Sequence, residues 1–204
     1  MLLSLHLALQ ALGFADTPDG ELVDMYMATR NERYFGELYR RYSPKVFGKC
    51  LTMLGNDAEA HDAVQDVFER VLTRIGGFRQ DAQFGTWLFS ITNNHCIDRL
   101  RRRKRRRVVT TEISDEHLPD EGGDDADDNW LEEQSPEAIR YILERLSELD
   151  RAALVLMYMD DMSVREIAAH LDLQESATKM RLKRARDRAR KHYLAWPGRQ
   201  AYLV

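Results

Sequence analysis

The chain has 204 residues, of which 44% are apolar and 31% charged, so it can bury one moderate hydrophobic core or two small ones. Its two cysteines, Cys50 and Cys96, are too few and too far apart for a disulfide framework, which excludes a disulfide-rich secreted scaffold and favours the cytoplasm. The net charge of -4 conceals a segregation, because residues 99–107 hold eight basic residues in nine whereas residues 112–133 hold eleven carboxylates and no Lys or Arg.

The first residues, MLLSLHLALQALGF, are apolar but lack the basic segment of a signal peptide. They are also shorter than the roughly 20 residues that span a bilayer, so we expect no membrane insertion. Residues 1–20 are expected to form an extra helix or a poorly ordered leader of unknown role. Pro18, Asp19 and Gly20 are expected to separate this leader from the first domain.

Residues 21–107 show apolar positions at helical spacing and no alternating strand pattern. One helix is expected around residues 35–42, and Pro44 is expected to open a second one that Gly55 and Asn56 end. Asp57 is the expected N-cap of a third helix, at about 58–75. Gly76 and Gly77 then end that helix, which leaves residues 78–86 as a loop before a helix that contains Trp87.

The segment at 84–107, FGTWLFSITNNHCIDRLRRRKRRR, combines aromatic residues with a dense basic run. Aromatic rings stack on unpaired bases and cations bind phosphates, so this order suits a single-stranded nucleic acid. Taken alone, the segment fits a solvated basic helix end beside a buried Trp equally well. Four residues could in principle bind zinc, namely Cys50, His61, His95 and Cys96, but their spacing matches no standard ligand pattern. We therefore expect no metal or other cofactor.

The acidic residues that follow belong to a stretch, 108–135, with few apolar side chains. Such a composition cannot offset the entropy of ordering, so we expect a flexible linker. Two interpretations of its charge remain equally open. Either the polyanion shields the basic run until nucleic acid displaces it, or the linker is merely a soluble tether.

The second expected domain, 136–196, begins at Pro136 and ends before a C-terminal tail, 197–204. Ser163 and Glu166 match a capping box, and residues 172–174 connect the short helix behind it to a longer helix at about 175–192. Two helices joined in this way, the second rich in Lys and Arg, indicate a helix-turn-helix. The alternative is an amphipathic helix with a basic solvent face. The inward face is expected to contain Thr178, Leu182, Ala185 and Ala189.

These motifs together resemble a bacterial RNA polymerase sigma factor of the extracytoplasmic function (ECF) group of the sigma-70 family. AHDAVQDVFERV at 60–71 resembles the family's polymerase-binding helix, and FRQDAQFGTWLFSITNNHCIDRLRR at 78–102 resembles its promoter-melting region. The segment at 146–190 is similar to its upstream-element domain. The resemblance implies an all-α fold with a region 2-like domain at 21–107 and a region 4-like helix-turn-helix domain at 136–196.

The resemblance also implies a function. The chain would be no enzyme but a subunit that binds the beta and beta-prime subunits of core RNA polymerase, selects promoter DNA and assists its melting, under control of an anti-sigma factor. The implied polymerase-binding ridge is Asp62, Gln65, Asp66 and Glu69. The implied minus-ten contacts are Arg79, Gln80, Asp81, Gln83, Phe84, Trp87, Asn94, Arg101 and Arg102, with Trp87 as a wedge or core support. The implied minus-thirty-five readers are Lys179, Met180, Lys183 and Arg184, with phosphate clamps Arg181 and Arg186.

The chain departs from the family's pattern in three places. Asp172 stands where Gly is usual, and Gln174 stands where a Ser cap is usual. Residues 176–178 stand where a run of a small residue, Thr and Val is usual, so Thr178 places a hydroxyl at a position expected to be buried. Two other classes of function stay open: a helix-turn-helix regulator that does not engage polymerase, and an interaction protein that sequesters a partner through a sigma-like surface. The ridge at 62–69 favours the sigma factor over a plain regulator, which has no need of it.

Overall fold

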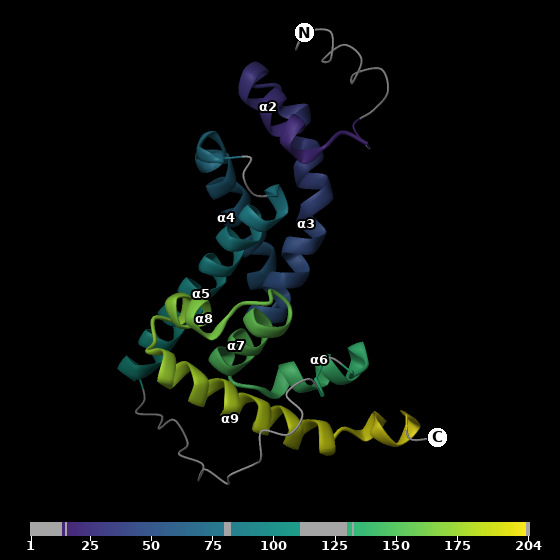
Figure 1. Cartoon of the computed structure of the whole chain (residues 1–204), viewed down its shortest axis with the longest axis vertical. Coiled ribbons are helices and arrows are strands. Elements are labelled where there is room, and N and C mark those ends of the chain that lie inside the picture. The colour runs from purple at the N-terminus through teal and green to yellow at the C-terminus, as the bar shows by residue number, and fades with distance from the viewer. Residues whose placement is uncertain (1–13, 15, 80–82, 111–129, 132, 203–204) are drawn as a thin grey trace. The chain divides into compact units, whose positions relative to one another are not determined.

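A computed structural model describes the chain except for residues 1–13, 15, 80–82, 111–129, 132 and 203–204 (Figure 1). All regular elements in the described residues are helices, which confirms the all-α prediction. Contacts between Cα atoms divide the chain into two compact units. The first comprises Met1–Leu51 and Asn56–Cys96, and the second comprises Thr52–Gly55 and Ile97–Val204.

The first unit contains α2 (Asp19–Thr29), most of α3 (Glu32–Leu54), α4 (Asp57–Arg74), the short η1 (Ile75–Gly77) and the first half of α5 (Phe84–Thr110). Aromatic rings connect these helices: Tyr26 on α2 lies 5.6 Å from Phe35 on α3, which lies 6.2 Å from Phe68 on α4. The core of this unit is made of fully buried apolar side chains, among them Leu22, Leu38, Val46, Val67 and Leu88.

The N-terminal boundary differs from the expected one. Pro18 is the N-cap of α2, and Asp19 and Gly20 form its first turn, so these residues open a helix instead of separating two segments. The carbonyl of Pro18 accepts the first intrahelical bond, from the Leu22 N–H. Thr17 is 5% exposed and therefore already belongs to the packed unit.

Three other local expectations are wrong in an instructive way. Pro44 lies inside a continuous α3 instead of opening a new helix; its position is exposed, so water can satisfy the carbonyl that its missing N–H leaves unpaired. Asn56, not Asp57, is the N-cap of α4 and accepts from the Glu59 N–H at 2.9 Å. The prediction for Gly55, by contrast, is confirmed: it ends α3 with a φ of 68°, in the left-handed region that glycine favours. Residues 84–86 belong to α5 and not to the predicted loop.

The second unit contains α6 (Pro136–Arg145), α7 (Glu148–Tyr158), α8 (Val164–Leu171), α9 (Glu175–Leu194) and η2 (Pro197–Tyr202). The longest of these, α9, packs along α6, α7 and α8 (Figure 1). Serine side chains cap α6, α7 and α8, and the predicted capping box of Ser163 and Glu166 is present. Most of the predicted linker lies outside the described residues, but its end is anchored, because the Trp130 ring lies 5.6 Å from the Tyr193 ring.

Candidate nucleic-acid interfaces

The predicted polar ridge on α4 faces solvent along its whole length. Asp62, Gln65, Asp66 and Glu69 are all exposed, while the opposite face of the helix is buried through residues that include Ala63, Val64, Val67 and Phe68. This division follows from the helical repeat, which places positions i, i+3, i+4 and i+7 on one side. The ridge thus lies on the surface of the unit and is held in place by a packed apolar face.

A buried imidazole on α5 lies beneath the ridge. Nε2 of His95 is 3.4 Å from Oδ2 of Asp66, and the His95 side chain is 4% exposed whereas that of Asp66 is 50% exposed. The neighbouring Asn94 is exposed, so α5 presents one residue to solvent and the next to α4. Sequence patterns did not single out His95 in this role, because an imidazole on a helix has no signature for its contact partner.

Four aromatic rings meet where α3 faces the start of α5, and we call them the aromatic cluster: Tyr42, Phe78, Phe84 and Trp87. The Phe84 ring lies 5.4 Å from the Tyr42 ring, 5.6 Å from the Phe78 ring and 5.8 Å from the Trp87 ring, and the Phe78 and Trp87 rings are 5.2 Å apart. Such offset and edge contacts are the favoured geometry of aromatic pairs.

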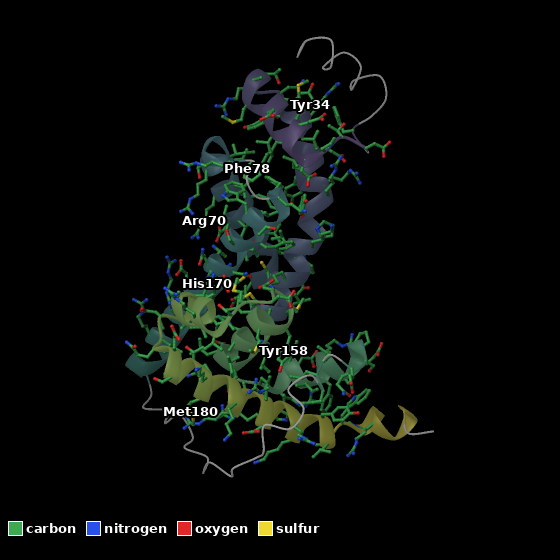
Figure 2. The ribbon with its side chains drawn as sticks, in the orientation of Figure 1. Tyr34, Arg70, Phe78, Tyr158, His170 and Met180 are labelled. Carbon is green, nitrogen blue, oxygen red and sulfur yellow. The ribbon has the colours of Figure 1, made fainter. Side chains whose placement is uncertain are left out.

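Phe84 lies at the centre of the aromatic cluster and is only 3% exposed. Phe78, labelled in Figure 2, and Trp87 are half-buried, so their rings retain accessible surface. In the folded state described here, a base can therefore reach Phe78 or Trp87 more readily than Phe84. Phe84 is among the predicted minus-ten contacts, whereas Phe78 and Tyr42 are not among the predicted site residues.

The remaining predicted minus-ten residues are divided between loop and helix. Arg79 and Gln83 are exposed, whereas Gln80 and Asp81 lie outside the described residues. Farther along α5, Arg102 is exposed and Arg101 is half-buried. Within the second unit Arg101 donates from Nη2 to the backbone carbonyl of His170 at 2.8 Å, and its Nη1 is 3.9 Å from Asp98.

The helix-turn-helix has the expected geometry. Asp172 ends α8 in the left-handed region with a φ of 56°, so the aspartate adopts the conformation that glycine usually provides. Gln174 is the N-cap of α9, but its side chain makes no capping hydrogen bond. The Thr178 side chain is fully buried, as predicted. Its hydroxyl donates to the Gln174 carbonyl at 3.1 Å, so this buried polar group has a hydrogen-bond partner.

Leu182, Ala185 and Ala189 are buried beside Thr178, which confirms the predicted inward face of α9. On the outer side Lys179, Met180 and Arg184 are exposed and Lys183 is half-buried; Met180, labelled in Figure 2, is 37% exposed. We call these four residues the recognition face. Its position on one side of a helix that is packed through the other side suits insertion into a major groove.

The two predicted phosphate clamps on α9 have different surroundings. Arg186 is half-buried on the helix surface, whereas Arg181 forms an ion pair inside the unit. Nη1 of Arg181 donates to Oδ1 of Asp150 at 2.8 Å, and Arg188 donates to the other oxygen of the same carboxylate. Asp150 on α7 is 1% exposed, so two arginines of α9 neutralise one buried charge.

In the part of the chain that the structure describes, no group of three or more His, Cys, Asp and Glu side chains is arranged to hold a metal ion. No helix of that part is long and apolar enough to cross a membrane. Cys50 and Cys96 are both buried and form no disulfide with each other; their sulfur atoms lie 3.6 Å apart.

Comparison with known proteins adds a family to this geometry. Residues 38–106 match the family described as Sigma-70 region 2, and residues 137–188 match the family described as Sigma-70, region 4. The chain is 31% identical over 182 residues to the ECF RNA polymerase sigma factor SigM of Mycobacterium tuberculosis, with 87% of each protein covered. It is 29% identical over 163 residues to the ECF sigma factor SigW of Bacillus subtilis, which covers 77% of this chain and 87% of SigW.

A solved structure is also similar to the chain. The structure of CnrH in complex with the cytosolic domain of CnrY aligns with a TM-score of 0.49 at 25% sequence identity. The alignment covers 87% of this chain and 97% of that one.

Proposed function

The chain belongs to the ECF group of the sigma-70 family, and we propose that it binds core RNA polymerase, directs it to specific promoters and assists DNA melting. In this proposal residues 21–107 act as a region 2-like domain and residues 136–196 as a region 4-like domain, joined by the acidic linker. The chain supplies binding surfaces, and the chemistry of RNA synthesis belongs to the polymerase.

The polymerase contact is assigned to the ridge on α4. Four exposed polar side chains, three of them carboxylates, form a negatively charged strip that suits a basic helical surface on the polymerase. This ridge is the single observation that favours a sigma factor over a helix-turn-helix regulator without a polymerase partner. A regulator of that kind requires the recognition face alone and is not favoured.

Strand separation is assigned to the aromatic cluster and the exposed polar residues around it. Opening a promoter costs roughly 1 to 2 kcal/mol per base-pair step in lost stacking. Stacking of an unpaired base on an aromatic ring returns on the order of 1 to 3 kcal/mol. The half-buried rings of Trp87 and Phe78 can supply that surface, while Arg79, Gln83 and Asn94 are placed for polar contacts to the captured strand.

Upstream recognition is assigned to the recognition face of α9. Lys179, Lys183 and Arg184 provide donors for base edges or phosphates, and Met180 provides an apolar contact. Arg186 stays a proposed phosphate clamp, whereas for Arg181 that role has to compete with its ion pair to Asp150. An anti-sigma factor, implied by the family resemblance, stays a prediction without an assigned surface.

Transcription reconstituted from purified core polymerase and this chain tests the proposal. We expect promoter-dependent transcripts, and no promoter-dependent transcript would overturn it. A ridge variant that combines Asp62→Asn, Asp66→Asn and Glu69→Gln should weaken core binding about tenfold, because a charge-complementary strip is lost. The matched control removes three exposed carboxylates from α2 and α3 through Glu21→Gln, Asp24→Asn and Glu32→Gln, and it should bind like the parent.

The assignment of α9 is tested separately by Lys183→Ala. This change should reduce discrimination among upstream-element sequences by a factor of about 5 to 100 while core binding stays intact. Equal preference of parent and variant across a panel of upstream elements would refute the role of Lys183.

A further inference from the structure

The first turn of α2 is tied to α3 by a carboxylate that has two partners. Oδ1 of Asp19 accepts from Nη1 of Arg41 at 2.8 Å, and Oδ2 accepts from the Tyr42 hydroxyl. Arg41 is itself held, because its Nε donates to Glu37 at 2.8 Å and its guanidinium also donates to the carbonyls of Phe14 and Thr17. Asp19 is therefore fixed by a network that is only partly accessible to water.

The Tyr42 ring carries this connection to the aromatic cluster. It meets Phe84 edge-on at 5.4 Å, and a Cβ atom placed on Gly85 would lie 3.2 Å from Cε1 of Tyr42. The absence of a side chain at Gly85 thus permits the tyrosine to approach the first turn of α5. Burial, together with the Asp19 hydrogen bond, raises the pKa of Tyr42 to about 12, so the hydroxyl stays a proton donor at neutral pH.

We propose that Asp19, acting through the Tyr42 hydroxyl, is a positioning residue for the aromatic cluster and thereby for promoter melting. The inference rests on the proposed function of this cluster. It assigns a role to an N-terminal residue that lies outside the matched region 2, which begins at residue 38.

The physical reason lies in the order of the contacts. Trp87 and Phe78 offer the accessible rings, both pack on Phe84, and Phe84 packs on Tyr42. A ring that must receive an unpaired base is effective only if its orientation is fixed before the base arrives. The hydrogen bond from the Tyr42 hydroxyl to Asp19 fixes the polar end of the Tyr42 ring, and so it contributes to the orientation of the whole cluster.

The decisive variants are Tyr42→Phe, which keeps the ring and removes the hydroxyl, and Asp19→Asn, which keeps the shape and removes the charge. Glu21→Gln is the matched control, since Glu21 lies on the same helix and is exposed. Each full-length variant is assembled with core polymerase. Permanganate reactivity of thymines in the minus-ten element then measures melting of duplex promoter, and a titration measures core affinity.

We expect Tyr42→Phe and Asp19→Asn to reduce melting of the duplex promoter about three- to tenfold, a range that matches the net contribution of one hydrogen bond. Core affinity should stay within about twofold of the parent. Transcription should recover on a template whose minus-ten element is already unpaired by mismatches, because the missing step has been supplied. Glu21→Gln should behave like the parent in all three measurements.

A purely structural role would give a different pattern. Loss of core affinity in parallel with melting, or equal defects on duplex and mismatched templates, would overturn the inference, as would normal melting by Tyr42→Phe. Gly85→Ala provides an independent test, because the added methyl should displace Tyr42 and give the same template-dependent defect. If the parent chain itself fails to support transcription, the proposed function fails; if the parent succeeds and Tyr42→Phe equals it, only the present inference fails.

Discussion

The two proposed DNA-reading surfaces are built in opposite ways. The aromatic cluster of the first unit places Phe84 in the core and leaves Phe78 and Trp87 half-buried, whereas the recognition face of α9 has three exposed residues on a helix whose other side is packed. Aromatic rings need neighbours to hold their orientation, while a helix face inherits its orientation from the backbone. Folding and DNA reading are thus coupled in the first unit and separable in the second.

Truncating one apolar member of each surface should give the largest contrast. Phe84→Ala removes a buried ring and should lower the free energy of unfolding by about 3–5 kcal/mol. Met180→Ala removes a 37% exposed side chain and should change it by no more than about 0.5 kcal/mol. Chemical denaturation followed by circular dichroism measures both, and equal stabilities of the two variants would break the comparison.

Asp150→Asn tests whether the recognition face depends on anything besides its helix. The variant leaves Arg181 and Arg188 without their shared carboxylate and should destabilise the protein by about 2–3 kcal/mol, less than a fully buried pair because both arginines are partly exposed. The free energy of binding to upstream-element DNA should change by less than the free energy of unfolding. Asp187→Asn, on the exposed side of α9, serves as the control and should alter stability little.

A smaller effect is expected for Glu37, which accepts a hydrogen bond from Arg41 and so belongs to the polar network that holds Asp19 and Tyr42. Hydrogen bonds from Arg40, with a further contribution from Arg41, lower the pKa of Glu37 from 4.5 to about 2. A carboxyl with a depressed pKa stabilises the fold above its unfolded value, and this contribution is lost as the pH falls from about 4.5 towards 2. Glu37→Gln should cost about 1 kcal/mol at pH 6, allowing for the exposure of Arg40, and should flatten the acid dependence of urea unfolding. An unchanged acid dependence in Glu37→Gln would contradict the proposed contribution of the Glu37 carboxylate to stability.

Periodicity and capping patterns were sufficient to predict most of the helical content. The capping box at Ser163, the start of α6 at Pro136 and the inward face of α9 are all as expected, because each depends on local spacing alone. Pro44 misled because the cost of a proline within a helix depends on whether its position is exposed, which the local pattern does not reveal. Asn56 and Asp57 are both good N-caps, and the choice between them depends on backbone geometry.

The candidate sites show the same distinction between features set by local sequence and features set by contacts with other segments. The exposure of the α4 ridge and of Lys179, Met180 and Arg184 could be predicted, since one helix decides it. The burial of Phe84 could not, because it results from rings contributed by α3 and by the chain before α5. Asp19 and Tyr42 are 23 residues apart in sequence, and no motif links a carboxylate to a hydroxyl at that distance.

The carboxylate of Asp150 has a consequence for how DNA binding should respond to salt. Each cation that neutralises a phosphate releases a counterion and contributes about 0.9 to the slope of log affinity against log salt. Helix α9 carries eight Lys and Arg side chains, but Arg181 and Arg188 already have an anionic partner within the protein. DNA affinity of this helix should therefore depend on ionic strength less steeply than its sequence suggests, so α9 retains a larger share of its affinity as the salt concentration rises.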